Sequence, residues 1–180
     1  MSAPLRTRRT TASSATVYLG LGSNVGDREA HLRGAVKALA VHGVEVEALS
    51  SLYETEPVGE VLDQRDFLNA VVRVRTSLEP EELLDLCKTI EVEHGRMLGG
   101  QRHGPRPLDL DMLIFDDLRL DSDRLTLPHP EVVTRRFVLE PLVELDPKLA
   151  LPDGSRVAEA LEQLGGSQRV ERVGPFQADG

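Results

Sequence analysis

Two aspartates stand two residues apart in an apolar stretch of this 180-residue chain, at Asp109 and Asp111. The stretch, residues 108–115 (LDLDMLIF), reads as a β-strand, although aspartate is a poor strand former. Alternate residues of a strand share a face, so the two carboxylates are expected side by side while Leu110 and Met112 face the core. Adjacent carboxylates repel each other, and a cation relieves the repulsion. Magnesium fits because it prefers oxygen ligands and often binds one or two carboxylates with substrate phosphates.

The loop before this strand has the opposite character. Residues 95–106 contain four glycines and three arginines (Arg96, Arg102 and Arg106) but no acidic residue. Glycine lets a loop change shape, and guanidinium groups bind phosphate oxygens in pairs. The alternatives are a solvated strand face for the aspartates and an ordinary exposed loop for the arginines. Taken together, the two features favour a metal-bridged, phosphate-rich ligand and phosphoryl-type transfer.

A second polar cluster follows at Arg124, Thr126, Pro128, His129 and Arg135. Arginine, threonine and histidine side chains at one place can hold the phosphates and ribose of a nucleotide. A lone histidine is more often structural than functional, so this cluster alone is a weak indication.

The elements that position these residues follow from hydrophobic periodicity and turn residues. Strands are expected at 16–22, 44–53, 67–75 and 108–115, and helices at 27–41 and from about Ser77 to Gly95. This strand-helix-strand-strand-helix-strand order predicts a ferredoxin-like α+β core, βαββαβ. A hairpin at 118–127 and short helices at 130–137 and 155–164 are expected after it.

The expected organisation is one domain over residues 16–165, a disordered tail over 1–15 and a polar coil over 166–180. The tail lacks acidic residues, as transit peptides do, but a plain disordered terminus is the preferred interpretation. The single cysteine, Cys87, excludes a disulfide framework and a thiolate zinc site.

Composition narrows the class of protein further. The net charge of −9 argues against non-specific binding to nucleic acid or anionic lipid, and six aromatic residues are few for stacking on single strands. No apolar run approaches the roughly 20 residues that span a bilayer. A cytoplasmic protein is expected.

The run at residues 102–113, RHGPRPLDLDML, is similar to the signature of the hydroxymethyl-dihydropterin pyrophosphokinases of folate biosynthesis. Further family motifs occur in the same order over residues 16–165, at 22–24 (GSN), 53–57 (YETEP), 67–70 (FLNA), 91–96 (EVEHGR), 125–130 (LTLPHP) and 152–154 (PDG). The resemblance implies a ferredoxin-like fold. It also implies transfer of a diphosphoryl group from ATP to the hydroxymethyl oxygen of 6-hydroxymethyl-7,8-dihydropterin, with release of AMP.

The resemblance also implies a role for each matching residue. Asp109 and Asp111 would bind two magnesium ions, Arg106 would contact ATP phosphates, and Arg96 would aid catalysis. The other ATP-contacting positions are Met112, through its backbone, and Arg124, Thr126, His129 and Arg135. The pterin positions are Phe67 and Phe137 as a sandwich, Thr55 and Asn69 as hydrogen-bonding partners, and the backbone near Val58. The implied partners are ATP and the pterin, with contact to dihydropteroate synthase left open.

Four positions depart from the commoner family pattern, at Glu56, Phe67, Leu98 and His103. They bear on affinity and loop dynamics, since none touches the acid pair. Two other functions use the same residues differently. A magnesium-dependent nucleotidyltransferase or phosphohydrolase would use the acid pair, whereas a nucleotide sensor would need neither Asn69 nor the two phenylalanines.

Overall fold

A computed structural model describes residues 14–57, 64–95, 106–166 and 168–177 of the chain, and every structural statement below refers to these ranges. The strands are β1 Ala15–Ser23, β2 Glu45–Leu49, β3 Leu52–Thr55, β4 Phe67–Thr76, β5 Asp109–Phe115, β6 Leu120–Asp121, β7 Thr126–Leu127 and β8 Val170–Gly174. The helices are α1 Arg28–Val41, α2 Pro80–Glu93, α3 Arg136–Leu145 and α4 Val157–Gln163.

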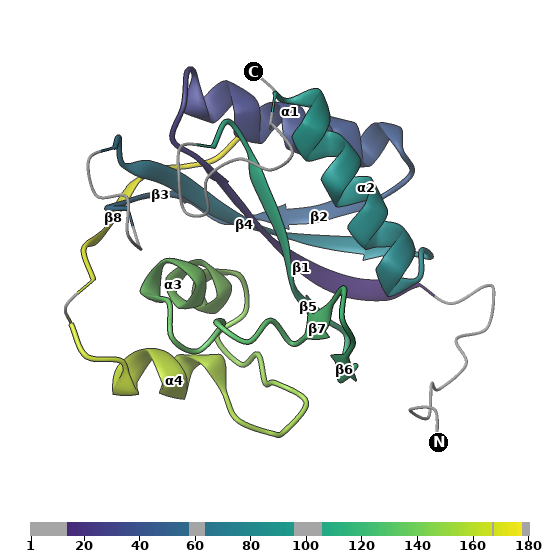
Figure 1. Cartoon of the computed structure of the whole chain (residues 1–180). Coiled ribbons are helices and arrows are strands. Elements are labelled where there is room, and N and C mark those ends of the chain that lie inside the picture. The colour runs from purple at the N-terminus through teal and green to yellow at the C-terminus, as the bar shows by residue number, and fades with distance from the viewer. Residues whose placement is uncertain (1–13, 58–63, 96–105, 167, 178–180) are drawn as a thin grey trace.

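One antiparallel sheet organises these elements. Its strand order is β5-β1-β4-β3-β8, and β2 also pairs with β4. Helices α1 and α2 cover one face of the sheet, and α3 covers the other with α4 packed against it (Figure 1). The predicted mixed α and β class is confirmed, and the elements from β1 to β5 differ from the expected βαββαβ order in having two strands, β2 and β3, where one was predicted.

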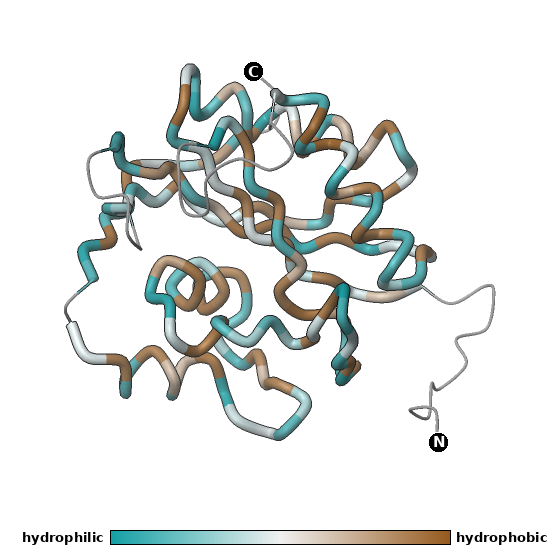
Figure 2. The backbone as a smooth tube through the Cα atoms, viewed as in Figure 1, coloured by the Kyte–Doolittle hydropathy of each residue, from teal (hydrophilic) through white to brown (hydrophobic). Residues whose placement is uncertain are grey.

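Alternation along the strands divides the core into two parts. Val17, Leu19 and Leu21 of β1 pack toward α1 and α2, whereas Tyr18 packs toward α3. Apolar residues accordingly concentrate along the sheet and recur at intervals on the helices (Figure 2). Burying apolar area in this way is the main stabilising contribution to the fold, at roughly 25 cal/mol per Å².

Strand β5 contains a bulge that the sequence did not indicate. Leu19 pairs with Met112 and Tyr18 with Ile114, so Leu113 is the extra residue. Leu113 and Ile114 therefore both pack toward α3, and Phe115 returns to the α1 and α2 side. The two aspartates precede the bulge and keep the alternation that their spacing predicted.

The predicted single strand over residues 44–53 was wrong, because a break at Ser50 and Ser51 divides it into β2 and β3. Ser50 donates its backbone N–H to the Val71 carbonyl at 2.9 Å, and its Oγ accepts the Val71 N–H at 2.9 Å. Ser51 turns away and donates its N–H and its hydroxyl to the Glu144 carboxylate on α3. Side-chain hydrogen bonds thus replace part of the strand ladder.

Two expectations about the C-terminal part were also wrong. The helix expected at 130–137 begins at Arg136 instead and continues to Leu145, with Pro141 in its interior and buried. The polar coil expected after residue 165 contains β8, which pairs with β3 and is followed by the buried Phe176. Burial of one face favours the longer helix α3, and pairing with the edge of β3 favours the strand β8, so tertiary contacts override the local signals at both places.

The other predictions for this part can be compared directly with the structure. The hairpin is confirmed in shorter form as β6 and β7, and α4 lies within the range predicted for the last helix. Ala15, predicted in the tail, belongs to β1 and is fully buried, while residues 1–13 of that tail lie outside the described residues.

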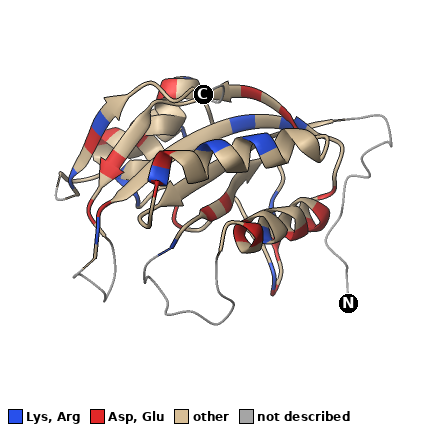
Figure 3. Ribbon diagram, turned by 90° about the horizontal axis from the view of Figure 1, so that it is seen from above, with Lys and Arg blue, Asp and Glu red and all other residues tan. Residues whose placement is uncertain are grey.

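Charged residues of both signs are interspersed on the strands and α1, while acidic residues prevail on α2 (Figure 3). Several charges are paired, as in Arg73 and Arg75 with Glu47 across β2 and β4. Across the described ranges, none of the helices has the length and apolarity needed to cross a membrane.

Replacing Glu144 with glutamine is expected to lower the free energy of unfolding by about 1–2 kcal/mol at neutral pH. Burial alone would raise the pKa of Glu144, but hydrogen bonds from Tyr53 and Ser51, with Arg172 nearby, lower it overall. A carboxyl with a lowered folded-state pKa stabilises the fold above its ordinary pKa of about 4.3, and this stabilisation is lost as pH falls through the folded value.

Urea unfolding of wild type and Glu144→Gln at pH 7 and near pH 3 measures this effect. The difference between the two proteins should shrink at the lower pH, because protonation makes the carboxyl resemble the amide. Glu162→Gln, on the exposed side of α4, serves as the control and should change stability at neither pH. A difference that stays constant with pH would contradict the assignment.

Candidate active site

A pocket of about 290 Å³ opens on the face of the sheet that α3 covers. Its walls come from β1, β3, β4 and β5, from the turn before α3 and from α3 itself. Nine of the predicted site residues line it: Thr55, Phe67, Asn69, Arg106, Asp109, Asp111, His129, Arg135 and Phe137. Residues expected to bind two different ligands therefore share one cavity.

Cross-strand pairing places the acid pair and Asn69 in a fixed relation. On β1, Gly22 pairs with Asp109 on one side and with Asn69 on the other, and Gly20 pairs with Asp111. Directly paired residues share a face, so Asp109, Gly22 and Asn69 form one row across the sheet. Strands lie about 4.8 Å apart, which separates the backbones of Asp109 and Asn69 by about 10 Å.

The two glycines of β1 form the floor of the pocket and were not predicted as site residues. A Cβ at Gly22 would lie 2.8 Å from Asn69 Oδ1, and a Cβ at Gly20 would lie 3.4 Å from the Leu113 side chain. A glycine in a strand interior often marks a close approach, and this was the available signal.

Asp109 and Asp111 project toward the pocket, while Leu108, Leu110 and Met112 are buried on the other face, as predicted. Asp109 Oδ1 lies 3.7 Å from Arg106 Nη1. Among the described residues, no group of three or more His, Cys, Asp or Glu side chains could hold a metal ion. Two carboxylates fit the usual habit of magnesium, which takes its remaining ligands from water and phosphate.

Asn24, in the turn between β1 and α1, holds the backbone of Arg106 in place. Arg106 donates its N–H to Asn24 Oδ1 at 2.7 Å, and Asn24 donates its own N–H to the Arg106 carbonyl at 3.0 Å. The Asn24 amide also donates to Gln64 Oε1 and to the Arg65 carbonyl. The buried Asn24 thereby links the segment before β5, which contains Arg106, to the segment before β4, which contains Gln64 and Arg65.

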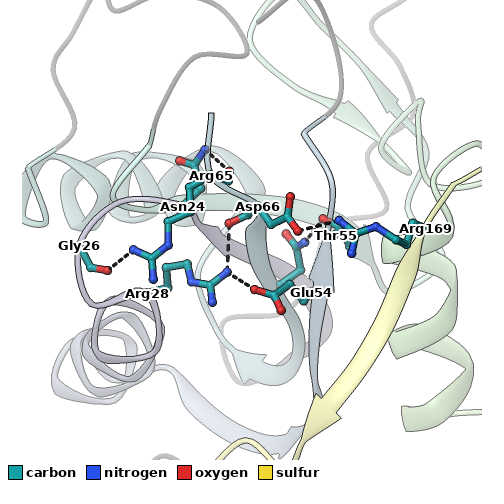
Figure 4. A network of polar contacts seen from close by, with 9 residues as sticks. Asn24, Gly26, Arg28, Glu54, Thr55, Arg65, Asp66 and Arg169 are labelled. Carbon is teal, nitrogen blue, oxygen red and sulfur yellow. Dashed lines mark hydrogen bonds and ion pairs between the residues drawn. The ribbon is translucent and has the colours of Figure 1, made fainter. Parts of the chain in front are cut away.

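A second set of polar contacts fixes the backbone just before Phe67 (Figure 4). Arg28 donates to Glu54 at 2.6 Å and to the Asp66 carbonyl at 3.0 Å. Arg169, next to β8, donates to the Asp66 carboxylate at 2.7 Å. Arg169, which directly precedes the C-terminal strand that the sequence did not indicate, thus helps to hold the backbone next to Phe67.

Thr55 and Asn69 form a buried polar edge. Asn69 Nδ2 donates to Thr55 Oγ1 at 2.7 Å, and the two residues are 7 % and 3 % exposed in that order. Phe67 and Phe137 line the same pocket and are half-buried. Aromatic faces beside a fixed polar edge suit a flat heterocycle.

The turn before α3 determines the orientation and the tautomer of the His129 ring. Its backbone N–H donates to the Leu113 carbonyl at 2.8 Å, and its Nδ1 accepts the Glu131 N–H at 3.1 Å. Burial, reinforced by the charge of Arg135, lowers the pKa of His129 below its ordinary value. The ring is therefore neutral at neutral pH with its proton on Nε2, where it can donate to an anionic ligand.

Sequence reasoning gave Glu91 no role of its own. Its carboxylate on α2 is 5 % exposed and accepts the Leu110 N–H at 2.9 Å, between the two aspartates of β5. Glu91 follows Cys87 by four residues on the buried stripe of the helix, so a charge among apolar positions was the available signal.

Three predicted residues within the described ranges, Met112, Arg124 and Thr126, do not line the pocket. The Met112 side chain is buried in the core, Arg124 pairs with Asp85 of α2, and the Thr126 hydroxyl lies 3.5 Å from Asp121. Arg96 and Val58 lie outside the described residues, as do the departing positions Leu98 and His103.

Comparison with known proteins bears on the nature of this pocket. The chain is 46 % identical over 157 residues to the 2-amino-4-hydroxy-6-hydroxymethyldihydropteridine pyrophosphokinase of Methylorubrum extorquens, covering 86 % of this chain and 98 % of that protein. It is 50 % identical over 129 residues to the protein of the same name from Bacillus subtilis, covering 71 % of this chain and 76 % of that one.

Longer proteins match as well. A folate synthesis bifunctional protein of Arabidopsis thaliana is 47 % identical over 174 residues, and the match covers 89 % of this chain and 36 % of that protein. A solved Plasmodium falciparum structure, HPPK-DHPS wild type with pterin and p-hydroxybenzoate, superposes with a TM-score of 0.65. It covers 84 % of this chain and 43 % of that one at 16 % identity, which supports the fold alone.

The family model of 7,8-dihydro-6-hydroxymethylpterin-pyrophosphokinase (HPPK) matches residues 18–147, which contain every residue of the candidate site. The enzyme class expected from the sequence motifs is thereby confirmed. Because this match spans most of the chain, the chain belongs to the 7,8-dihydro-6-hydroxymethylpterin-pyrophosphokinase family.

Proposed function

We propose that the pocket transfers a diphosphoryl group from ATP to the hydroxymethyl oxygen of 6-hydroxymethyl-7,8-dihydropterin and releases AMP. The observation that carries the proposal is the row of Asp109, Gly22 and Asn69 across the sheet. It puts a carboxylate suited to a phosphate-bound cation and an amide suited to a heterocycle edge about 10 Å apart over a bare glycine floor.

The pterin would occupy the β3 and β4 side of the pocket. Thr55 and Asn69 form the polar edge there, and Phe67 and Phe137 offer aromatic faces. The backbone near Val58 is also proposed to bind the pterin. Such recognition is specific because only a ligand that presents complementary atoms can bond to the buried amide and hydroxyl without breaking the hydrogen bond that joins them.

The ATP phosphates would occupy the β5 side. Asp109 and Asp111 would hold magnesium, two ions in this proposal, and magnesium there would neutralise phosphate charge. Arg106 and Arg135 would bind phosphate oxygens, and His129 would donate from Nε2. Arg124, Thr126 and the Met112 backbone are proposed to contact the rest of the nucleotide, and Arg96 is proposed to aid catalysis.

In the reaction itself the hydroxymethyl oxygen attacks the β-phosphorus in line, and the bond from that phosphorus to the AMP oxygen breaks. The residues of this chain contribute by positioning the two substrates and by balancing charge, which is how phosphoryl transfer is generally catalysed. Asn24 serves this purpose indirectly, because its hydrogen bonds hold Arg106 at the pocket.

The ferredoxin-like topology, the partner and the cellular location are also part of this proposal. The order β5-β1-β4, continued by β2 and β3, supports the ferredoxin-like assignment. A contact with dihydropteroate synthase is supported only by relatives whose names join HPPK to DHPS. The cytoplasmic location stays a prediction, since some relatives of the chain are named as mitochondrial.

Product analysis distinguishes the proposal from its alternatives. With ATP, magnesium and the pterin alcohol, the protein should release AMP in equal amount to pterin diphosphate. ADP would indicate an ordinary kinase, pyrophosphate a nucleotidyltransferase, free phosphate a phosphohydrolase, and bound ATP without turnover a sensor.

Asn69→Ala should also abolish pterin binding to protein loaded with an ATP analogue. Thr89→Ala, a polar change on α2 outside the pocket, serves as its control.

A further inference from the structure

Arg135 is held by two neighbours on the α3 side of the pocket. Its guanidinium forms an ion pair with Glu131, four residues earlier in the chain, and its guanidinium carbon lies 5.5 Å from the centroid of the Phe137 ring. Both Glu131 and Arg135 line the pocket. The arginine proposed to bind phosphate therefore already has an anionic partner in the same cavity.

The acid paired with Arg135 differs in one respect from the acid paired with Arg106. Arg106 lies 3.7 Å from Asp109, which belongs to the predicted metal pair, so a bound cation would compensate the charge of that acid. Glu131 does not belong to the predicted metal pair, because it lies in the turn before α3, so a cation bound by Asp109 and Asp111 would not be bound by Glu131. Phosphate oxygens that approach Arg135 meet a full negative charge at Glu131.

Exposure shows which member of this pair faces an incoming ligand. The Glu131 side chain is 46 % exposed, whereas the Arg135 side chain is 23 % exposed and partly covered by Phe137. The carboxylate is thus the more accessible member of the pair. An anion that enters the pocket must displace the carboxylate or share the guanidinium with it.

We propose that Glu131 competes with nucleotide phosphates for Arg135 and thereby weakens nucleotide binding. This inference rests on the proposed function, because it takes ATP as the ligand that Arg135 binds. Competition of this kind favours release of the nucleotide product. AMP carries fewer phosphate groups than ATP, so it competes less well than ATP with Glu131 for the guanidinium.

Titration calorimetry with magnesium and α,β-methylene-ATP tests the proposal, because the methylene group prevents cleavage between the α and β phosphates. Glu131→Gln should tighten binding about three- to fivefold, the range expected for a partly exposed ion pair. The matched control is Glu140→Gln. Glu140 pairs with Arg136 at the same four-residue spacing but does not line the pocket, so its change should leave affinity within about 1.5-fold.

A double-mutant cycle separates competition from a general effect of charge. In an Arg135→Gln background, Glu131→Gln should change affinity less than about 1.5-fold, because the contested guanidinium is gone. If Glu131→Gln tightened binding of the analogue equally in both backgrounds, the effect would come from the change in net charge alone. That result would overturn the proposal. Weaker binding in Glu131→Gln would overturn it too, since Glu131 would then align Arg135 for phosphate.

The same titrations keep this inference apart from the proposed function. If the wild-type protein binds the analogue and Glu131→Gln binds it equally well, the inference alone is overturned. If the wild-type protein does not bind the analogue at all, the proposed function fails and the inference fails with it.

Discussion

Replacing Asp111 with asparagine is expected to lower kcat/KM for AMP release by about a thousandfold or more while leaving the fold intact. The amide keeps the size of the side chain but removes the charge that would hold magnesium. Asp111 is exposed at the pocket and pairs across strands with Gly20, so the change disturbs no buried packing. Asp109→Asn should show a loss of similar size and should also disturb the pair with Arg106.

Initial rates at several magnesium concentrations, together with thermal unfolding, check this result. Loss of activity with an unchanged melting temperature is expected for both aspartate variants. The matched control is Asp117→Asn, an exposed acidic residue just beyond the end of β5. Near-normal turnover in either variant would show that the acid pair does not hold the metal.

Replacing Gly22 with alanine is expected to lower kcat/KM for the pterin about 10- to 100-fold, while the affinity for a magnesium–ATP analogue changes less than about threefold. The new Cβ would lie 2.8 Å from Asn69 Oδ1 and 3.7 Å from the Phe67 ring. The amide is at the end of its side chain and can move, but only by giving up its 2.7 Å hydrogen bond to Thr55. Loss of a buried hydrogen bond costs about 1–3 kcal/mol, which corresponds to the stated range.

Gly20→Ala is the matched control for this substitution. It adds the same methyl group to the same strand, but its Cβ would meet the Leu113 side chain at 3.4 Å, a contact that a small shift accommodates. A smaller effect on the pterin is therefore expected, measured by steady-state kinetics for both substrates. An equal loss for ATP and pterin in Gly22→Ala would indicate general disruption of the sheet rather than a blocked pterin edge.

Prediction from the sequence succeeded where an element has one apolar face and one polar face, because this pattern specifies which residues are buried. The alternation around Asp109 and Asp111 required that the aspartates and the adjacent apolar residues take opposite faces, and the structure has them so. The helical period of α2 predicts a buried stripe of Leu83, Leu86, Cys87 and Ile90, and all of these are buried except Leu86, which is partly buried. In both cases the local pattern and the tertiary environment favour the same conformation.

Prediction failed where distant residues compete with the local pattern. Residues 44–53 have strand character throughout, yet Glu144 of α3 draws Ser51 out of the ladder. Residues 170–174 are polar enough for a coil, yet β3 offers an unpaired edge with which they form β8. The bulge at Leu113 depends on the pairing between β1 and β5 and has no signal within the strand itself.

The chemistry of this protein is readable from its amino-acid sequence, because residue types and their spacing specify ligands and local periodicity: an acid pair, a basic loop and ordered motifs are sufficient to indicate the family. Which of these residues share a pocket depends on the folded structure. It put Asn69 about 10 Å from Asp109 across Gly22, left Arg124 paired with Asp85, and paired Arg135 with Glu131. The placement of Asn69 and Asp109 depends on strand order and register, which join residues about 50 to 90 positions apart and leave no trace in local sequence.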